Sequence, residues 1–347
     1  MIPVIDMHCD TAGALLQRRD EGRTFSLREN DLHIDLLRMK KGGYMCQCFG
    51  IFTPLGMFGV PFDGRPHEPG ASDRYASCTD YARAMSDLID RELTANSDLI
   101  RPALSAADIE KNQAEGFMSA LKTIEEGAVF GGSTELLGEF YDRGVRMATL
   151  TWNYPNGLAW PNRIFNEAGE YHPEPETERG LTEAGRRIIA DMEELGMLID
   201  VSHLGDRGIW DIFEVTRPDT PIIASHSNAR GLCGHPRNLS DEMLRAIADR
   251  GGVAGINFCA DFLSARGDNY SRAEDLINHM KYMKNIAGAE VIGLGTDFDG
   301  IGGTLEINGC GEMQKLADAM DAAGFTVDEI EKVFYRNVLR VMKTVLG

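Results

Sequence analysis

The chain has 347 residues, of which 43% are hydrophobic and 26% are charged, and its formal net charge is −19 at pH 7. This composition is typical of a soluble globular protein that can bury a large core. The acidic excess argues against nucleic acid and anionic membranes as partners, because binding to either requires basic patches.

Eight apolar runs rich in β-branched residues follow one another along the chain. They predict strands at residues 2–10, 44–52, 121–126, 146–153, 198–204, 221–227, 252–260 and 291–299. Helical patterns lie between them, at residues 32–41, 73–96, 105–120, 133–143, 182–195, 206–215, 240–249 and 271–286. Several runs are almost entirely apolar, as expected of parallel strands covered by helices. Capping boxes predict two helix starts, one at Ser271 with Glu274 and one at Thr326 with Glu329.

The repeated alternation of strand and helix predicts an α/β protein with one domain, residues 1–347, folded as a (β/α)₈ TIM barrel. The patterns at 73–96 and 105–120 would add a helical insert. Long segments rich in glycine and proline each follow a strand and precede a helix, at residues 53–71, 154–180 and 300–311. We therefore expect these loops on the carboxyl-terminal face of the barrel, where barrel enzymes build their sites.

The cysteines and the chain start bear on the compartment. Seven cysteines form an odd set without disulfide-like spacing, which predicts reduced thiols; Cys46 and Cys48 in particular are expected in the core. A strand-like run begins directly after Met1, so we expect no signal peptide. No apolar run is long enough to cross a membrane. A cytoplasmic protein is the resulting expectation.

Acids and imidazoles stand at the ends of the apolar runs. His8 and Asp10 are two residues apart, so on a strand both would point to one side and Cys9 to the other. Glu125 and Glu126 would point to opposite sides, so only one of them can reach the barrel axis. Strand alternation alone leaves that choice open, and it predicts that the other carboxylate is solvated.

Further metal-ligand residue types close later runs. His203 and His226 each end an apolar run, and imidazole with carboxylate suits zinc and other first-row divalent ions. Together with the earlier acids and His8, these ligands are too many for one four-coordinate zinc and suit two ions that share a carboxylate. Asp297, expected within its strand, is the better general acid/base candidate, while Asp299 begins the turn.

Other polar residues give weaker signals. Arg237 follows the sixth run and is either a clamp for a substrate carboxylate or a surface residue. The histidines that do not end a strand are expected at the surface or in structural roles; they are His33, His67, His172, His235 and His279.

At these residues the sequence resembles the membrane or renal dipeptidase family, the M19-type metallopeptidases of the amidohydrolase superfamily. The segments that carry the resemblance follow the family's order over essentially the whole chain: DMHCDT, IEEG, RMATLTW, LTEAGRRIIADMEELGMLIDVSH, SHSNAR followed by RN, and GLGTDFDG. The resemblance implies two Zn²⁺ ions, with other divalent ions as alternatives. It places one ion on His8 and Asp10 and the other on His203 and His226, with Glu125 as the bridge.

The resemblance also implies Asp297 as the catalytic acid/base and Arg237 as the clamp on the substrate's C-terminal carboxylate. Small dipeptides, including those with a C-terminal D-residue, are the implied substrates. One position departs from the family, which often has a histidine after the fourth strand. Trp152 stands there, followed by Asn153. Either Asn153 supplies the polar contact to the substrate or the pocket accepts different substrates.

The predicted reaction is peptide hydrolysis by a hydroxide shared between two ions that lie ~3.5–4 Å apart. One alternative is another binuclear amidohydrolase acting on a lactone, a cyclic amide or a phosphoester. That branch typically uses HxH and a strand lysine, whereas this chain has HxD and a glutamate. A non-catalytic, metal-stabilised binding protein is the other alternative, although every ligand and the acid are retained. The sequence leaves the oligomeric state open, and a homodimer is compatible with it.

Overall fold

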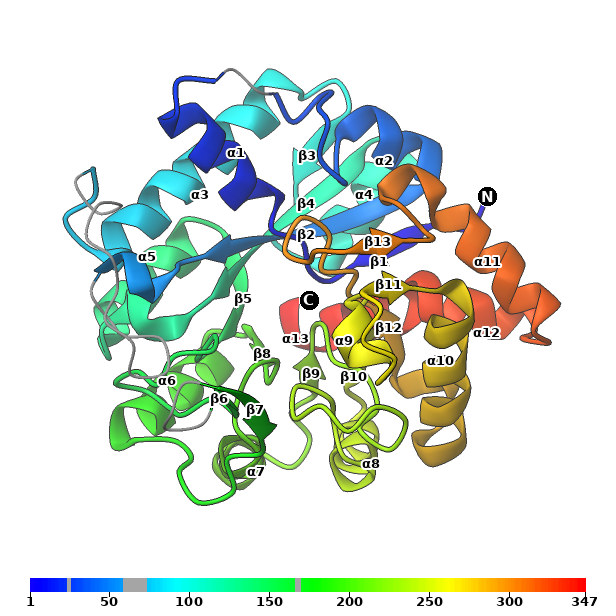
Figure 1. Ribbon diagram of the computed structural model, residues 1–347. Helices are drawn as coiled ribbons and strands as arrows, with labels where there is room; N and C mark the ends of the chain where they lie inside the picture. The colour runs from blue at the N-terminus through cyan, green and yellow to red at the C-terminus, as the bar shows by residue number, and fades with distance from the viewer. Residues whose placement is uncertain (24–25, 59–73, 166–169) are drawn as a thin grey trace.

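The structure is a computed structural model that describes residues 1–23, 26–58, 74–165 and 170–347. Its centre is a closed barrel of parallel strands surrounded by helices (Figure 1). In barrel order the strands are β1 (Val4–Asp6), β2 (Tyr44–Phe52), β4 (Met118–Glu125), β5 (Val145–Thr149), β8 (Leu198–Asp200), β9 (Ile222–Ala224), β10 (Val253–Ile256) and β12 (Ile292–Leu294). Pairing of β12 with β1 closes the ring. The predicted (β/α)₈ barrel is therefore confirmed.

The helices follow the strands along the chain. They are α1 (Thr11–Asp20), α2 (Leu36–Gly42), α3 (Cys78–Ala95), α4 (Ala106–Ala114), α5 (Thr134–Asp142), α6 (Glu183–Glu194), α7 (Asp206–Val215), α8 (Asp241–Asp249), α9 (Ala260–Leu263), α10 (Ala273–Ala287), α11 (Met313–Ala322), α12 (Val327–Glu331) and α13 (Asn337–Leu346). Side-chain oxygens that accept a backbone N–H of the first turn mark many helix starts, as at Ser77, Ser105, Ser133, Thr182 and Ser240.

Short strands lie outside the barrel. β3 (Ile100–Pro102) pairs with the first half of β4. β6 (Arg163–Phe165) and β7 (Tyr171–Glu174) form an antiparallel pair, and β11 (Tyr270–Ser271) pairs with β13 (Thr304–Leu305). The last two pairs arise from the long loops after β5, β10 and β12.

The two ends of the barrel differ in chemistry. At the amino-terminal end an apolar cluster fills the interior, where Met7, Met147 and Leu198 meet Val338 and Met342 of α13. That helix closes this end of the barrel. Cys46 and Cys48 belong to the same buried cluster, as expected, and all seven cysteines are free. Buried acids and histidines lie together at the opposite, carboxyl-terminal end of the barrel, and the candidate site is at that end.

Several predicted boundaries were wrong. The helix predicted at 105–120 ends at Ala114, because Gly116 has a φ of 86° that stops it and β4 starts at Met118. Helix α1 was not predicted. The start of the pattern at 73–96 and most of the loop 53–71 lie outside the described residues, and α3 itself begins at Cys78.

Of the two predicted capping boxes, the one at Thr326 and Glu329 is confirmed. The one at Ser271 is wrong, because Ser271 lies in β11 and α10 begins two residues later, at Ala273. The backbone N–H of Ala273 donates instead to Glu306, at 3.0 Å. A tertiary contact thus replaces the local cap.

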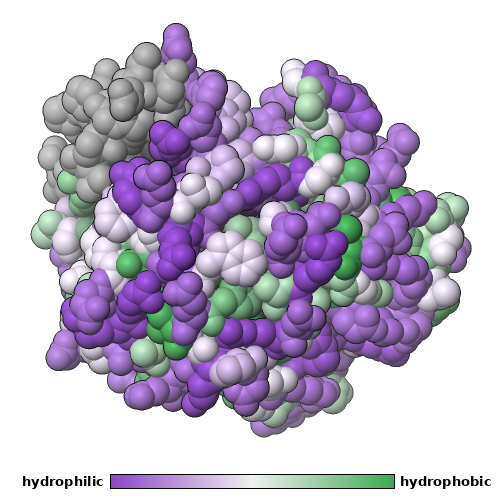
Figure 2. Space-filling view, turned by 90° about the horizontal axis from the view of Figure 1, so that it is seen from below, coloured by the Kyte–Doolittle hydropathy of each residue, from purple (hydrophilic) through white to green (hydrophobic). Residues whose placement is uncertain are grey.

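The surface is largely polar. The face in Figure 2 is mainly hydrophilic, with hydrophobic side chains in smaller groups between polar ones. Within the described part of the chain, no helix combines the length and the apolarity needed to cross a membrane.

Candidate active site and metal centre

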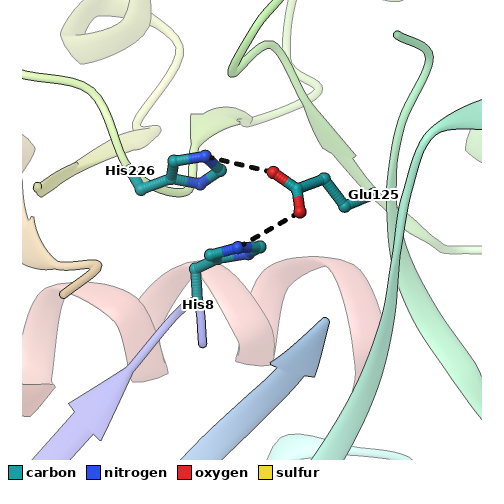
Figure 3. A group of neighbouring side chains, drawn as sticks. All are labelled: His8, Glu125 and His226. Atoms are coloured by element: carbon teal, nitrogen blue, oxygen red, sulfur yellow. Dashed lines mark ion pairs between the residues drawn. The ribbon is translucent and has the colours of Figure 1, made fainter. Parts of the chain in front are cut away.

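Four of the predicted ligands meet around one carboxylate at the carboxyl-terminal end of the barrel. Glu125 ends β4, and Figure 3 shows its carboxylate beside the stacked rings of His8 and His226, with one oxygen directed at each ring. Its Oε2 lies 3.4 Å from Nε2 of His8. Its Oε1 lies 3.0 Å from Nε2 of His203 and 3.4 Å from Nε2 of His226. Oε2 thus faces His8, whereas Oε1 faces His203 and His226. A carboxylate that bridges two ions requires such an arrangement, with different ligands at its two oxygens.

A second group of donors overlaps with the first. Asp10 Oδ2 lies 3.4 Å from His8 Nε2, and Asp297 Oδ1 lies 3.8 Å from the same nitrogen. The ligand atoms of His8, Asp10 and Asp297 lie close enough to hold one ion, as do those of His8, Glu125 and His226. The structure therefore brings together all five predicted ligands and the predicted acid/base.

Hydrogen bonds at the far side of two rings determine which nitrogen faces the site. Nδ1 of His203 lies 2.9 Å from Oδ1 of Asn153. Nδ1 of His226 lies 2.7 Å from the hydroxyl of Ser225, which donates its own proton to Asp200 at 2.5 Å. Both imidazoles must then carry a proton on Nδ1 and a lone pair on Nε2.

Those two Nε2 atoms, of His203 and His226, are only 2.8 Å apart. Two lone pairs at this distance repel each other unless a positive charge lies against them. Burial lowers the pKa of both rings well below its usual value, and the charges of Arg237 and His8 lower it further. Neutral imidazoles beside a shared carboxylate form a donor set that fits divalent metal ions.

The pKa values of two carboxyl groups of the site are raised, whereas those of His203 and His226 are lowered. Burial raises the pKa of Glu125 and of Asp297 to about 7, and the nearby charge of Asp10 adds to the shift while His8 opposes it. Burial also disfavours a charged His8, but the carboxylates of Glu125 and Asp10 outweigh it and raise the pKa of His8 well above its usual value. A carboxyl group poised near neutrality suits proton transfer.

Asp297 was expected within its strand, but β12 ends at Leu294, and Asp297 has a φ of 60°. Its Oδ2 accepts a hydrogen bond from the side-chain amide of Asn257 at 2.9 Å. Asp299 also has a positive φ, and its two oxygens accept from the Thr11 hydroxyl at 2.6 Å and the backbone N–H of His33 at 2.7 Å. Both residues therefore lie in the turn beyond the strand, where the alternation of strand side chains does not apply.

Arg237 is 4% exposed, so the surface alternative is excluded. Its guanidinium donates to the Ser227 hydroxyl at 3.3 Å and to the His226 carbonyl at 3.4 Å. Its Nε has no partner, and none of the ion pairs among the described residues includes it. Burial lowers the pKa of Arg237, while Asp297 and Glu125 counteract this. A buried cation of this kind is costly unless an anion joins it.

The segment after β5 contributes to the wall of the site. Trp152 lines the cavity, with its ring 4.9 Å from that of Phe52, and Asn153 supports His203 as described. The expectation of a solvated second glutamate was wrong. Glu126 is fully buried, because its φ of 115° ends the strand alternation and turns its side chain toward Trp152.

The cavity above these residues has a volume of about 950 Å³. Its lining combines the metal-site residues with apolar and small side chains, among them Gly13, Ala14, Phe52, Pro54, Met57, Tyr81, Trp152, Cys259 and Phe262, and with the polar side chains of Gln17, Asp20, Glu21 and Arg74. Arg237 is not part of this lining.

The other histidines that the structure describes lie away from the metal-site donors. His279 is buried and contacts the Leu263 carbonyl at 3.0 Å, and His235 contacts the Tyr171 hydroxyl at 3.1 Å. His33 holds Asp299, whereas His172 pairs with Glu174 on the hairpin. His67 lies outside the described residues.

Sequence reasoning missed three residues that support the site from behind: Asn257, which donates to Asp297, and Ser225 and Asp200, which stand behind His226. Their signal was weak, because each lies in or beside an apolar run without a pattern that marks it.

A closed parallel barrel with a buried cluster of imidazoles and carboxylates at its carboxyl-terminal end defines a metal-dependent barrel enzyme. The chain matches the family model for membrane dipeptidase, peptidase family M19, over residues 1–346. It belongs to that family and is a metallo-dipeptidase.

Curated proteins and solved structures are similar to this chain over most of its length. Dipeptidase aclJ of Aspergillus oryzae is 30% identical over 312 residues, which cover 89% of this chain and 69% of that protein. A Klebsiella pneumoniae protein encoded in the pqqA 5' region, described as uncharacterized, is 37% identical over 258 residues. These residues cover 74% of this chain and 93% of that protein.

Among solved structures, the M19 metallopeptidase dipeptidase AC has a TM-score of 0.86 and 29% identity, covering 100% of this chain and 99% of that one. A Rhodobacter sphaeroides metallopeptidase, liganded with a phosphinate mimic of the dipeptide L-Ala-D-Ala, has a TM-score of 0.85 and 28% identity, covering 99% of both chains.

Proposed function

We propose that the enzyme hydrolyses small dipeptides with the help of two divalent ions, both of them zinc. One ion would be held by His8 and Asp10 and the other by His203 and His226, with Glu125 between them. The observation that carries this proposal is the geometry around Glu125, whose two oxygens face separate imidazole groups at 3.0–3.4 Å. The Nε2 lone pairs of His203 and His226 also favour a bound cation, because they face each other at 2.8 Å and would otherwise repel.

When bound, such ions act as Lewis acids toward the scissile carbonyl and the attacking water. Asp297 accepts a proton from that water and delivers it to the leaving amine as the C–N bond breaks. The amide of Asn257 occupies Oδ2 of Asp297, so Oδ1 is the oxygen available for this transfer. Burial, which brings the pKa of Asp297 to about 7, prepares the group to exchange a proton in both directions.

Arg237 would pair with the substrate's free C-terminal carboxylate. Support comes from its burial without an ion pair among the described residues and from its unpartnered Nε. A bidentate pair there would limit substrates to those that end one residue beyond the scissile bond. The phosphinate mimic of L-Ala-D-Ala on the Rhodobacter sphaeroides relative supports acceptance of a C-terminal D-residue.

The test combines metal analysis with steady-state kinetics on L,L and L,D dipeptides. Protein purified without chelators should contain close to two equivalents of zinc and should cleave dipeptides. A reproducible single equivalent that His203→Ala and His226→Ala leave unchanged would rule out the second ion. Absence of turnover on every dipeptide with metal fully loaded would refute the proposed substrate class.

A further inference from the structure

Glu126 is a buried carboxylate outside the proposed metal ligands and the proposed proton transfer. It is fully buried, and its oxygens receive three donors. Oε1 accepts the backbone N–H of Ala128 at 2.9 Å and the side-chain amide of Asn156. Oε2 accepts the backbone N–H of Trp152, also at 2.9 Å. One side chain at the end of β4 therefore anchors the segment that follows β5.

That segment carries two residues of the site. The ring of Trp152 lines the cavity and packs beside those of Phe52 and Tyr154, at 4.9 and 5.5 Å between centroids. The next residue, Asn153, receives the Nδ1 proton of His203. The position of Trp152 is thus set by a hydrogen bond to its backbone and not only by packing of its ring.

The cavity extends beyond the metal-site residues and includes apolar side chains that have no part in binding metal. Phe52, Met57, Tyr81 and Trp152 supply apolar surface, and its volume is about 950 Å³. Arg237 is absent from the lining. If the C-terminal carboxylate pairs with Arg237, the N-terminal residue is the part of a dipeptide that remains to occupy this space.

We propose that Glu126 is a positioning residue for substrate selection, which holds Trp152 as the wall that receives a large apolar side chain on the substrate's N-terminal residue. This inference rests on the proposed function, because the orientation of the dipeptide follows from Arg237.

The hydrogen-bond pattern supplies a specific perturbation. Both oxygens of Glu126 accept N–H groups, whereas the side-chain amide of Gln has one oxygen and one NH₂ group. In Glu126→Gln the NH₂ group must therefore point at an N–H donor, either that of Trp152 or those of Ala128 and Asn156. Asn156 cannot turn its own amide to compensate, because its Oδ1 accepts from Leu158 and Ala159 and its Nδ2 also donates to Leu150. With the oxygen kept on Ala128 and Asn156, the variant releases Trp152.

The experiment compares kcat/KM for phenylalanyl-alanine and alanyl-alanine at pH 8. The two oxygens of Glu126 accept three N–H donors, an arrangement that favours the ionised carboxylate. The wild type should favour the phenylalanyl substrate by about 10–200-fold, the range of one hydrophobic pocket contact. Glu126→Gln should reduce this preference by about tenfold, mainly through KM for the phenylalanyl substrate.

As a control, the same substitution is made in the Trp152→Ala variant. This variant keeps the backbone N–H of residue 152 but lacks the indole ring that forms the wall. In that background Glu126→Gln should cause no further loss of preference. An equal loss for both substrates, or the same loss of preference with and without the Trp152 ring, would overturn the inference. If Glu126→Gln does not fold, Glu126→Asp gives the same test, since its shorter carboxylate can reach the adjacent Ala128 N–H but not Trp152. A wild type that cleaves neither dipeptide would instead refute the proposed function.

Discussion

Replacing Ser225 by alanine should weaken metal binding although Ser225 is not itself a proposed ligand. The hydroxyl is fully buried and stands between Asp200, at 2.5 Å, and Nδ1 of His226, at 2.7 Å. In Ser225→Ala the Nδ1 proton of His226 loses its acceptor, so the tautomer that presents the Nε2 lone pair to the site is no longer favoured. Asp200 keeps its Oδ1 contacts to the backbone of Ser202 and of residue 225.

The expected size follows from the groups left without partners. Loss of a partner behind a metal ligand typically costs about 10–100-fold in metal affinity, or roughly 1.4–2.7 kcal/mol. Each buried polar group left unsatisfied also costs about 1–3 kcal/mol of folding stability. Three buried groups lose a partner in Ser225→Ala, on His226, on Asp200 and on Ser202, whose hydroxyl lies 3.2 Å from that of Ser225, so the metal-free protein should lose stability as well.

The assay is a competition between the protein and a chelator of known zinc affinity at constant pH, accompanied by thermal unfolding of the metal-free form. Ser119→Ala is the matched control. Ser119 is also fully buried in the barrel, and its hydroxyl accepts from Asn112 at 3.0 Å without contacting a metal-site residue. If Ser225→Ala binds zinc as tightly as Ser119→Ala, the hydrogen bond does not control the imidazole and the reasoning is refuted.

Three further predictions concern the reaction. Asp297→Asn should keep both metal equivalents but lower kcat by about 10²–10⁴-fold; near-normal turnover would remove Asp297 from the proton transfer. Arg237→Ala should erase the preference for a dipeptide over its amide, a loss of about 1.5–3 kcal/mol, whereas a retained ratio would exclude the clamp. Because only ionised Asp297 can accept a proton, kcat/KM should fall as the pH drops through its pKa. Burial sets that value to about 7, and bound cations lower it, so the midpoint should lie below 7; a flat profile from pH 5 to 8 would contradict this assignment.

The sequence itself determined the fold class and the residue types of the site. Apolar runs alternating with helical patterns specify parallel strands covered by helices, and this pattern predicted the barrel and its strand order along the chain. Because parallel strands in a barrel end on the same face, acids and imidazoles at run ends were expected together there. His8, Glu125, His203 and His226 are found on that face.

The direction of individual side chains was decided only by the tertiary structure. Alternation holds within a strand, but Glu126, His203, Asp297 and Asp299 all have positive φ in the segments that follow strands. A residue held in that region points where its hydrogen bonds place it, and those bonds come from segments far away in sequence. Glu126 is therefore buried against Trp152 instead of solvated, and distant partners such as Asn153 decide which imidazole nitrogen faces the site. No local pattern contains these contacts, because they form only when the loops of the closed barrel pack together.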